Sequence, residues 1–176
     1  MKVAVFSTKP YDEAYLQGSE FSGGVEFTFY ETSLSLSTLS LCKGFSVISL
    51  FVNDDAKKEV LSGLKELGVS SIVLRCAGYN NVDIQSAREL GIHVFRVPAY
   101  SPHAVAEHAL ALMLSLNRKI PKAFMRVREG NFSLSGLMGF DMYGKTVGII
   151  GVGKIGKALA RILKGMGCHV LGIDQT

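Results

Sequence analysis

The chain has 176 residues, of which 48% are hydrophobic and 19% charged, and its formal net charge is +4. These values are ordinary for a globular protein, and the length allows one domain, or one domain and part of another. Because the basic residues are scattered and never form a long run, the composition does not favour nucleic acid as a partner.

The cysteines and the apolar segments exclude several further classes. Cys42, Cys76 and Cys168 lie far apart and form no C-x-x-C pair, so we expect neither a disulfide framework nor a metal site. We find no secretion signal and no apolar stretch long enough to cross a membrane. The sequence therefore predicts a cytoplasmic protein with no membrane partner.

The first hundred residues alternate short apolar runs with amphipathic stretches. Strands are predicted over 3–6, 47–52, 71–76 and 92–97, and helices over 55–67 and 83–90. This alternation predicts an α/β fold with a doubly wound, flavodoxin-like parallel sheet. The segment ETSLSLSTLSLC, residues 31–42, fits a strand over one part and a helix over another, and its structure stays open.

The pattern changes near residue 100, where we place a boundary between domains 1–100 and 101–176. Pro102 suits the first turn of a helix that extends to about residue 117, with Ser101 as its N-cap. Pro121 interrupts the helical pattern, which can resume to about residue 129. The glycine-rich segment 130–144 is expected to be a loop.

A glycine-rich motif, G-x-G-x-x-G, follows in GIIGVGKIG as Gly151, Gly153 and Gly156. It comes directly after a predicted strand, 146–150, and opens a helix, and a second strand then ends at Asp174. This order of strand, turn, helix, strand and acid is typical of a dinucleotide site.

Each part of the motif has a physical role in such a site. Gly151 permits a tight turn, Gly153 lets the backbone approach a pyrophosphate, and Gly156 lets the helix pack close to the strand. The start of the helix offers free N–H groups to the phosphates. Asp174 would accept hydrogen bonds from ribose hydroxyls and repel a 2′-phosphate, which favours NAD over NADP.

Two alternatives to the dinucleotide motif stay open. Gly148, Gly153 and Lys154 also satisfy the P-loop spacing G-x-x-x-x-G-K, but Ile155 stands where a P-loop needs Ser or Thr for magnesium. The other alternative is a glycine turn that only packs a helix on a strand.

Three longer segments carry a resemblance to a known family. They are RCAGYNNVD, VPAYSPHAVAEHALALMLSLNR and NFSLSGLMGFDMYGKTVGIIGVGKIG, at 75–83, 97–118 and 131–156. Together they resemble the N-terminal portion of the D-isomer-specific 2-hydroxyacid dehydrogenases, and among these the type that acts on D-lactate. The resemblance implies a substrate domain, 1–100, followed by a linking helix and the first part of a Rossmann NAD-binding domain, 101–176.

The resemblance also implies an activity and its site residues. The reaction is hydride transfer between NAD(H) and a small 2-oxoacid, pyruvate above all, to give a D-2-hydroxyacid. Backbone N–H groups of Ala77 and Gly78 would bind the substrate carboxylate, with Tyr100 close to the substrate. The implied cofactor contacts outside the glycines and Asp174 are Val105, Lys154 and Ile155.

No catalytic residue is assigned within the chain. In the family the arginine, glutamate and histidine of the reaction lie beyond the position that matches Thr176, so the 176 residues alone are expected to be inactive. The four histidines (His93, His103, His108, His169) and Arg75 are expected to be structural or surface residues. The resemblance further implies a homo-oligomer, with the helix at 102–117 as a contact.

Two other functions stay open. The chain could be a non-catalytic dinucleotide-binding or assembly protein of the same fold. Within the enzymes, the phosphoglycerate and formate dehydrogenases are a weaker alternative, because RCAGYNN and PAYSP favour the lactate type.

Overall fold

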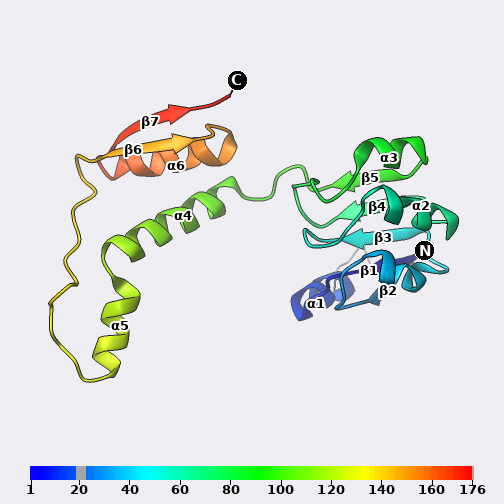
Figure 1. Ribbon diagram of the computed structural model, residues 1–176, viewed down its shortest axis with the longest axis horizontal. Coiled ribbons are helices and arrows are strands. Elements are labelled where there is room, and N and C mark those ends of the chain that lie inside the picture. The colour runs from blue at the N-terminus through cyan, green and yellow to red at the C-terminus, as the bar shows by residue number, and fades with distance from the viewer. Residues whose placement is uncertain (19–22, 176) are drawn as a thin grey trace. The chain divides into compact units, whose positions relative to one another are not determined.

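The computed structural model describes residues 1–18 and 23–175. It divides the chain into two compact units, Met1–Tyr100 and Ser101–Thr176, each of which contains a parallel sheet and packed helices (Figure 1). Each unit is described by itself below.

The first unit is a five-stranded parallel sheet with helices between the strands. Its strands are β1 (Lys2–Val5), β2 (Glu26–Phe29), β3 (Val47–Leu50), β4 (Ser71–Leu74) and β5 (His93–Arg96), and its helices are α1 (Pro10–Gly18), the 3-10 helix η2 (Leu36–Cys42), α2 (Lys58–Glu66) and α3 (Ile84–Glu89). The strand order is β2-β1-β3-β4-β5. This is the flavodoxin-like order, so the predicted fold class is confirmed. In such sheets the strand order reverses between β1 and β3, and ligands bind beyond the carboxyl ends of the strands.

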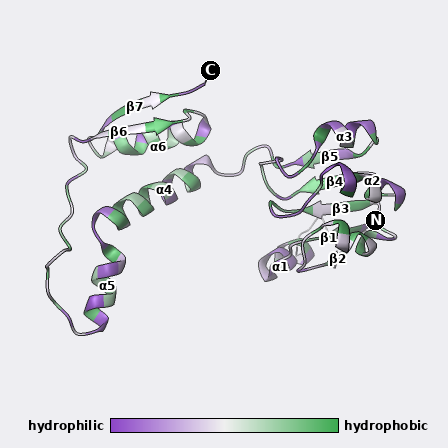
Figure 2. Ribbon diagram, viewed as in Figure 1, coloured by the Kyte–Doolittle hydropathy of each residue, from purple (hydrophilic) through white to green (hydrophobic). Residues whose placement is uncertain are grey.

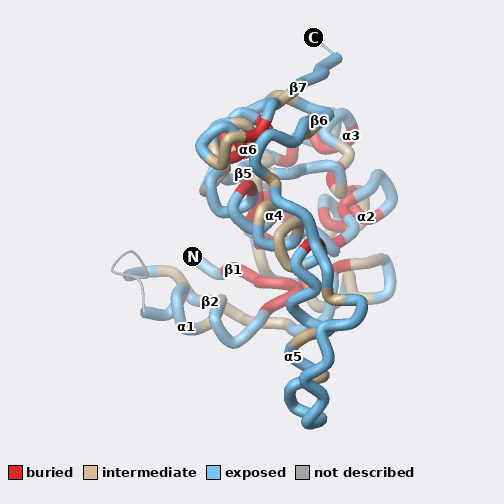
Figure 3. The backbone as a smooth tube through the Cα atoms, turned by 90° about the vertical axis from the view of Figure 1, so that its left-hand side faces the viewer, coloured by how far each residue is buried: buried red, intermediate tan, exposed pale blue. Residues whose placement is uncertain are grey.

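One face of this sheet carries the main core. Ile48, Leu50 and Ile72 alternate along the strands and are buried against α2, whose Val60 and Leu61 face them. In Figure 3 the buried residues are red, and β1 and α2 each carry a red stretch. This packing fixes the strands, and therefore the positions of the loops that leave their carboxyl ends.

Two elements of the first unit were not predicted. Helix α1 buries none of its described residues, and β2 is a half-buried edge strand of four residues. The ambiguous segment 31–42 ends in η2. There the Thr38 hydroxyl accepts a hydrogen bond from the Ser35 N–H at 2.8 Å, so polar side chains rather than an apolar period determine the local structure.

The second unit is a βαβ arrangement with two preceding helices. It contains α4 (Pro102–Asn117), α5 (Ile120–Arg128), β6 (Thr146–Ile150), α6 (Lys154–Gly165) and β7 (His169–Ile173). The two strands pair in parallel, and α6 packs on α4. The Ser101 hydroxyl accepts a hydrogen bond from the Ala104 N–H at 3.1 Å, which confirms the predicted N-cap. Pro121 lies in the first turn of α5.

Helices α4 and α5 leave many large apolar side chains exposed. Figure 2 shows hydrophobic residues in green along both helices, and α5 buries none of its residues. The exposed residues of this surface are Leu112, Leu116, Ile120, Phe124, Met125 and Val127. Many exposed apolar side chains on neighbouring helices are typical of an interface.

The described residues also set limits on other sites. Across 1–18 and 23–175, no helix is both long and apolar enough to span a bilayer. The same residues contain no group of three His, Cys, Asp or Glu side chains that could hold a metal ion. The three cysteines are free and buried.

The buried thiol of Cys42 makes a prediction for alkaline stability. Burial raises the pKa of Cys42 from 9.0 to about 12, so the unfolded chain ionises this group first. The stabilising contribution is complete below about pH 9 and is lost as the pH rises towards about 12. We expect the melting temperature to fall less between about pH 7.5 and about pH 10 in Cys42→Ala than in the unchanged protein. Equal falls in both proteins would contradict this expectation.

Candidate functional site

The glycine turn of the second unit joins β6 to α6. Gly151 has φ +90°, a conformation that favours glycine, and its N–H donates to the carbonyl of Ile173 at 2.8 Å. A Cβ atom on Gly156 would overlap the carbonyl oxygen of Gly151, whereas one on Gly153 would meet open space. The turn therefore leaves no room for a side chain at Gly156, and it leaves free space beside Gly153.

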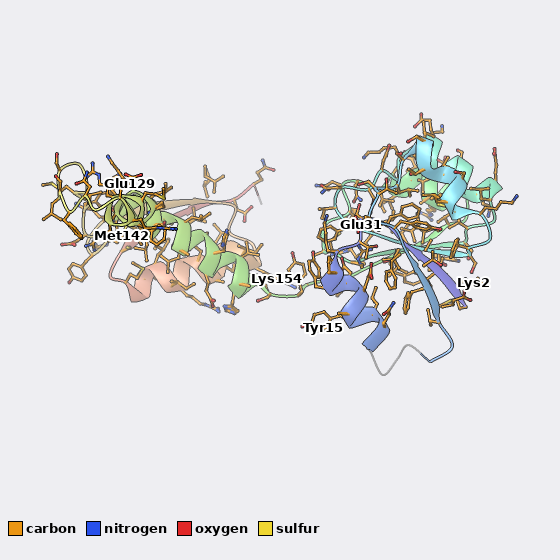
Figure 4. The ribbon with its side chains drawn as sticks, turned by 90° about the horizontal axis from the view of Figure 1, so that it is seen from below. Lys2, Tyr15, Glu31, Glu129, Met142 and Lys154 are labelled. Atoms are coloured by element: carbon orange, nitrogen blue, oxygen red, sulfur yellow. The ribbon has the colours of Figure 1, made fainter. Side chains whose placement is uncertain are left out.

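The start of α6 offers unused hydrogen-bond donors. Lys154, labelled in Figure 4, is the first residue of the helix, and its N-cap Gly153 has no side chain to cap it. Within the part of the chain that the structure describes, the N–H groups of Lys154, Ile155 and Gly156 have no acceptor. Free N–H groups, the helix dipole and the Lys154 charge together suit an anionic group such as a phosphate.

Asp174 lies against this turn. One carboxylate oxygen, Oδ2, accepts a hydrogen bond from the N–H of Val152 at 2.8 Å, and Oδ1 accepts one from the N–H of Gln175 at 2.9 Å. Asp174 comes one residue after β7, whose end is held to Gly151. The structure thus brings Asp174 and the glycine turn together, and the carboxylate is exposed and able to accept further bonds.

The structure shows no hydrogen bond, among the described residues, between Val105 and the glycine turn. Val105 lies in the first turn of α4 and is partly exposed. Only the family resemblance therefore supports a role for Val105 in binding the cofactor.

In the first unit, the turn at Cys76–Ala77–Gly78 follows β4. Its three carbonyl groups are all engaged: Cys76 accepts from the Val97 N–H at 3.3 Å, Ala77 from Arg96 Nη1 at 2.9 Å, and Gly78 from the Cys76 thiol at 3.2 Å. Among the described residues, the N–H groups of Ala77 and Gly78 have no acceptor. We call residues 76–78 the carboxylate turn, because its free donors suit an anion.

The Cys76 thiol is suited to its place in this turn. Burial raises its pKa, Arg75 lowers it and Asp54 raises it further. The net rise keeps the sulfur protonated at neutral pH, so that it can donate to the Gly78 carbonyl.

Polar side chains join the ends of neighbouring strands next to the carboxylate turn. Arg75 donates from Nη2 to the carbonyl of Phe6 at 2.8 Å, and its Nε lies 3.3 Å from Oδ1 of Asp12. These contacts join β4 to the end of β1 and to α1, which is a structural role. Tyr100, the last residue of the unit, is 69% exposed.

Residues that the sequence did not single out complete this region. Asp54 is buried and accepts hydrogen bonds from Ser7 Oγ at 2.8 Å, the Leu34 N–H at 2.8 Å and the Phe51 N–H at 2.6 Å. Asn81 donates to the carbonyls of Phe51 and Asp54. The only signal in the sequence was the position of FVNDD, residues 51–55, and RCAGYNN, residues 75–81, each at the end of a predicted strand.

Comparison with known proteins shows the family. The family model of the catalytic domain of D-isomer specific 2-hydroxyacid dehydrogenases matches residues 3–173 of the chain. The chain belongs to this family. The resemblance inferred from the sequence is therefore confirmed. The family is one of oxidoreductases, because its members are 2-hydroxyacid dehydrogenases.

Several dehydrogenases of this family are closely similar in sequence. D-lactate dehydrogenase of Escherichia coli is 54% identical over 174 residues, which are 99% of this chain and 53% of that protein. 2-Hydroxyacid dehydrogenase A of Aspergillus oryzae is 49% identical over 177 residues, 99% of this chain and 51% of the relative. The chain spans about half the length of the curated relatives that it matches.

Solved structures of 2-hydroxyacid dehydrogenases have the same fold. The apo structure of the Escherichia coli D-lactate dehydrogenase matches with a TM-score of 0.89 and 53% identity, over 100% of this chain and 56% of that one. The Aquifex aeolicus D-lactate dehydrogenase, complexed with NAD and lactic acid, matches with a TM-score of 0.84 and 31% identity, over 99% of this chain and 51% of that one. A nicotinamide dinucleotide is thus a cofactor of the family.

Proposed function

We propose that this chain provides the substrate-carboxylate turn and the dinucleotide turn of an NAD-dependent dehydrogenase of small D-2-hydroxyacids, with pyruvate and D-lactate as the preferred pair. Residues 1–100 would form the substrate domain, and 101–176 the linking helix and first part of the NAD domain. The observation that carries the proposal is the bond between Asp174 and the Val152 N–H, because it holds an acid beside the glycine turn.

The residues of the second unit fit this cofactor. The open space at Gly153 and the free N–H groups of Lys154, Ile155 and Gly156 suit the pyrophosphate, and Asp174 has unused acceptor capacity for ribose hydroxyls. When bound, NAD(H) supplies the hydride that is exchanged with the substrate carbon. Val105 is a further contact by resemblance.

The carboxylate turn fits a small 2-oxoacid. The N–H groups of Ala77 and Gly78 would donate to its carboxylate, while the engaged carbonyls of the turn keep these donors in place. Tyr100 would lie close to the bound acid. This arrangement orients the substrate through fixed backbone donors, which cost no rearrangement when the acid binds.

The preference for NAD gives a direct test at Asp174. In Asp174→Ser we expect the affinity for NADH to fall about tenfold or more, because the hydroxyl replaces the charged acceptor of the ribose hydroxyls. The affinity for NADPH should rise or stay unchanged, because a charge that repels the 2′-phosphate is gone. Fluorescence titration of the complete protein with each nucleotide measures both effects.

Another acidic residue of the second unit serves as the control. Asp141 is an exposed residue of the same unit with no ion pair among the described residues, and Asp141→Asn should leave both affinities unchanged. An unchanged preference for NADH in Asp174→Ser would argue against the proposed role of Asp174.

Catalytic function is tested by turnover. We expect the complete protein to reduce pyruvate with NADH and to form D-lactate, identified by chiral chromatography. Binding of NADH without reduction of any small 2-oxoacid would favour a non-catalytic dinucleotide-binding protein instead.

The exposed apolar surface of α4 and α5 supports a homo-oligomer. A second copy of the protein would cover the exposed apolar side chains of these helices, whose hydrophobic residues are green in Figure 2. Sedimentation of the complete protein tests this part of the proposal.

A further inference from the structure

We propose that Arg96 is a positioning residue for the substrate carboxylate. It fixes and polarises the peptide group between Ala77 and Gly78, whose N–H donates a hydrogen bond to the carboxylate. This inference rests on the proposed function, because it assigns a role within the carboxylate turn. Sequence patterns did not single out Arg96, which lies at the end of an edge strand and is exposed.

The position of Arg96 follows from the pairing of β4 with β5. In this register Arg96 lies opposite Leu74, so its side chain extends from the strand end beside the residues that form the carboxylate turn. Arg96 Nη1 donates to the carbonyl of Ala77 at 2.9 Å and lies 3.4 Å from that of Pro98. The guanidinium also lies over the ring of Tyr79, 5.4 Å from its centroid, and Tyr79 directly follows the carboxylate turn in sequence.

The contact acts on one of the two free donors. The carbonyl of Ala77 and the N–H of Gly78 belong to the same peptide group, which is planar. A cation bonded to the carbonyl fixes the plane of this peptide and draws electron density from its nitrogen, so that the N–H becomes a stronger donor. The Gly78 N–H, which has no acceptor among the described residues, thereby gains affinity for a carboxylate.

Charge adds a second effect. Within residues 1–18 and 23–175, no carboxylate forms an ion pair with Arg96, so its charge is not neutralised by a partner. Arg75, which also adjoins the turn, differs in both respects: its guanidinium is bonded to the carbonyl of Phe6 and paired with Asp12. Arg96 is thus the arginine whose field reaches an anion at the carboxylate turn.

The test compares Arg96→Gln and Arg96→Lys in the complete protein, with NADH and pyruvate. For Arg96→Gln we expect the KM for pyruvate to rise about tenfold, with the KM for NADH and kcat within about twofold of the original values. Arg96→Lys keeps the charge but loses the planar donor, so its KM should lie between the two. The inhibition constant of oxamate, a carboxylate analogue of the substrate, should rise in parallel.

Arg88 provides the matched control, because it is an exposed arginine that lies on α3 and outside the carboxylate turn. Arg88→Gln should leave every constant unchanged. A wild-type KM for pyruvate in Arg96→Gln would overturn the inference. So would a lower melting temperature with equal losses towards pyruvate and NADH, since that pattern indicates a structural role only.

A failure of the proposed function can be distinguished from a failure of the role proposed for Arg96. If the unchanged protein binds NADH but does not reduce pyruvate, the proposed activity is wrong, and calorimetric titration of oxamate into the NADH complex still measures carboxylate binding. Weaker oxamate binding in Arg96→Gln than in Arg88→Gln then supports the role of Arg96. Equal binding in the two variants, or none to the unchanged protein, overturns it.

Discussion

Replacing Gly156 by alanine should remove measurable NADH binding. The new Cβ atom would overlap the carbonyl oxygen of Gly151, lie 3.2 Å from its carbonyl carbon and 3.4 Å from Ile149 Cγ2. Because two of these contacts are with backbone, the conflict is relieved only if α6 moves away from the turn. Its free N–H groups then leave the position that suits a pyrophosphate, and we expect at least about a hundredfold loss of affinity in a fluorescence titration.

Two other glycines separate this effect from a general response to alanine. Gly165 lies near the end of α6 with no atom within 4 Å of an added Cβ, so Gly165→Ala should bind NADH normally and stabilise the unit slightly. Gly153→Ala should also fold normally, because a Cβ there meets open space. It should nevertheless weaken NADH binding, since the side chain would occupy the place proposed for the pyrophosphate. Normal binding by Gly156→Ala would refute the close packing of helix and turn.

The fold of the first unit was predictable wherever burial imposed a period on the sequence. The runs at β1, β3 and β4 contain buried residues, and α2 has apolar residues at helical spacing. The predicted run 92–97 contains the buried Ile92 directly before β5, whereas β5 itself is mostly exposed. The edge strand β2 and helix α1 escaped prediction because neither buries a residue fully, so no pattern marked them. Apolar residues recur at a regular spacing where one face of an element is buried, so an element with little burial shows little of this spacing in its sequence.

The two halves of the candidate site differ in the same way. The glycine turn is local: its glycines, the helix that follows and Asp174 lie within one βαβ unit, so spacing alone indicates their arrangement. The carboxylate turn was found only through resemblance, because its donors are backbone groups. Arg96 lies 19 residues from Ala77, and Asp54 lies 47 from Ser7, and these contacts depend on strand pairing that the sequence does not show.

Replacing Asp54 by asparagine should strongly destabilise the first unit. Its two carboxylate oxygens accept three hydrogen bonds, from Ser7 Oγ, the Leu34 N–H and the Phe51 N–H, inside a buried site. Asparagine has the same shape, but its NH₂ group would face a donor in place of an acceptor. One or more buried donors would lose their partner, which costs about 3 kcal/mol of the free energy of unfolding.

The neighbouring Asp55 is the matched control for this substitution. Its carboxylate is exposed and accepts one hydrogen bond from the Lys57 N–H, so Asp55→Asn should change the stability by less than about 0.5 kcal/mol. Hydrogen exchange of peptides from β1 and β3 reports on this unit specifically, and both should exchange faster in Asp54→Asn alone. Because Asp54 joins the ends of β1 and β3 at the point where the strand order reverses, the same loss should loosen the segment that supports the carboxylate turn. Equal protection in the two variants would mean that the buried carboxylate does not hold these strand ends together.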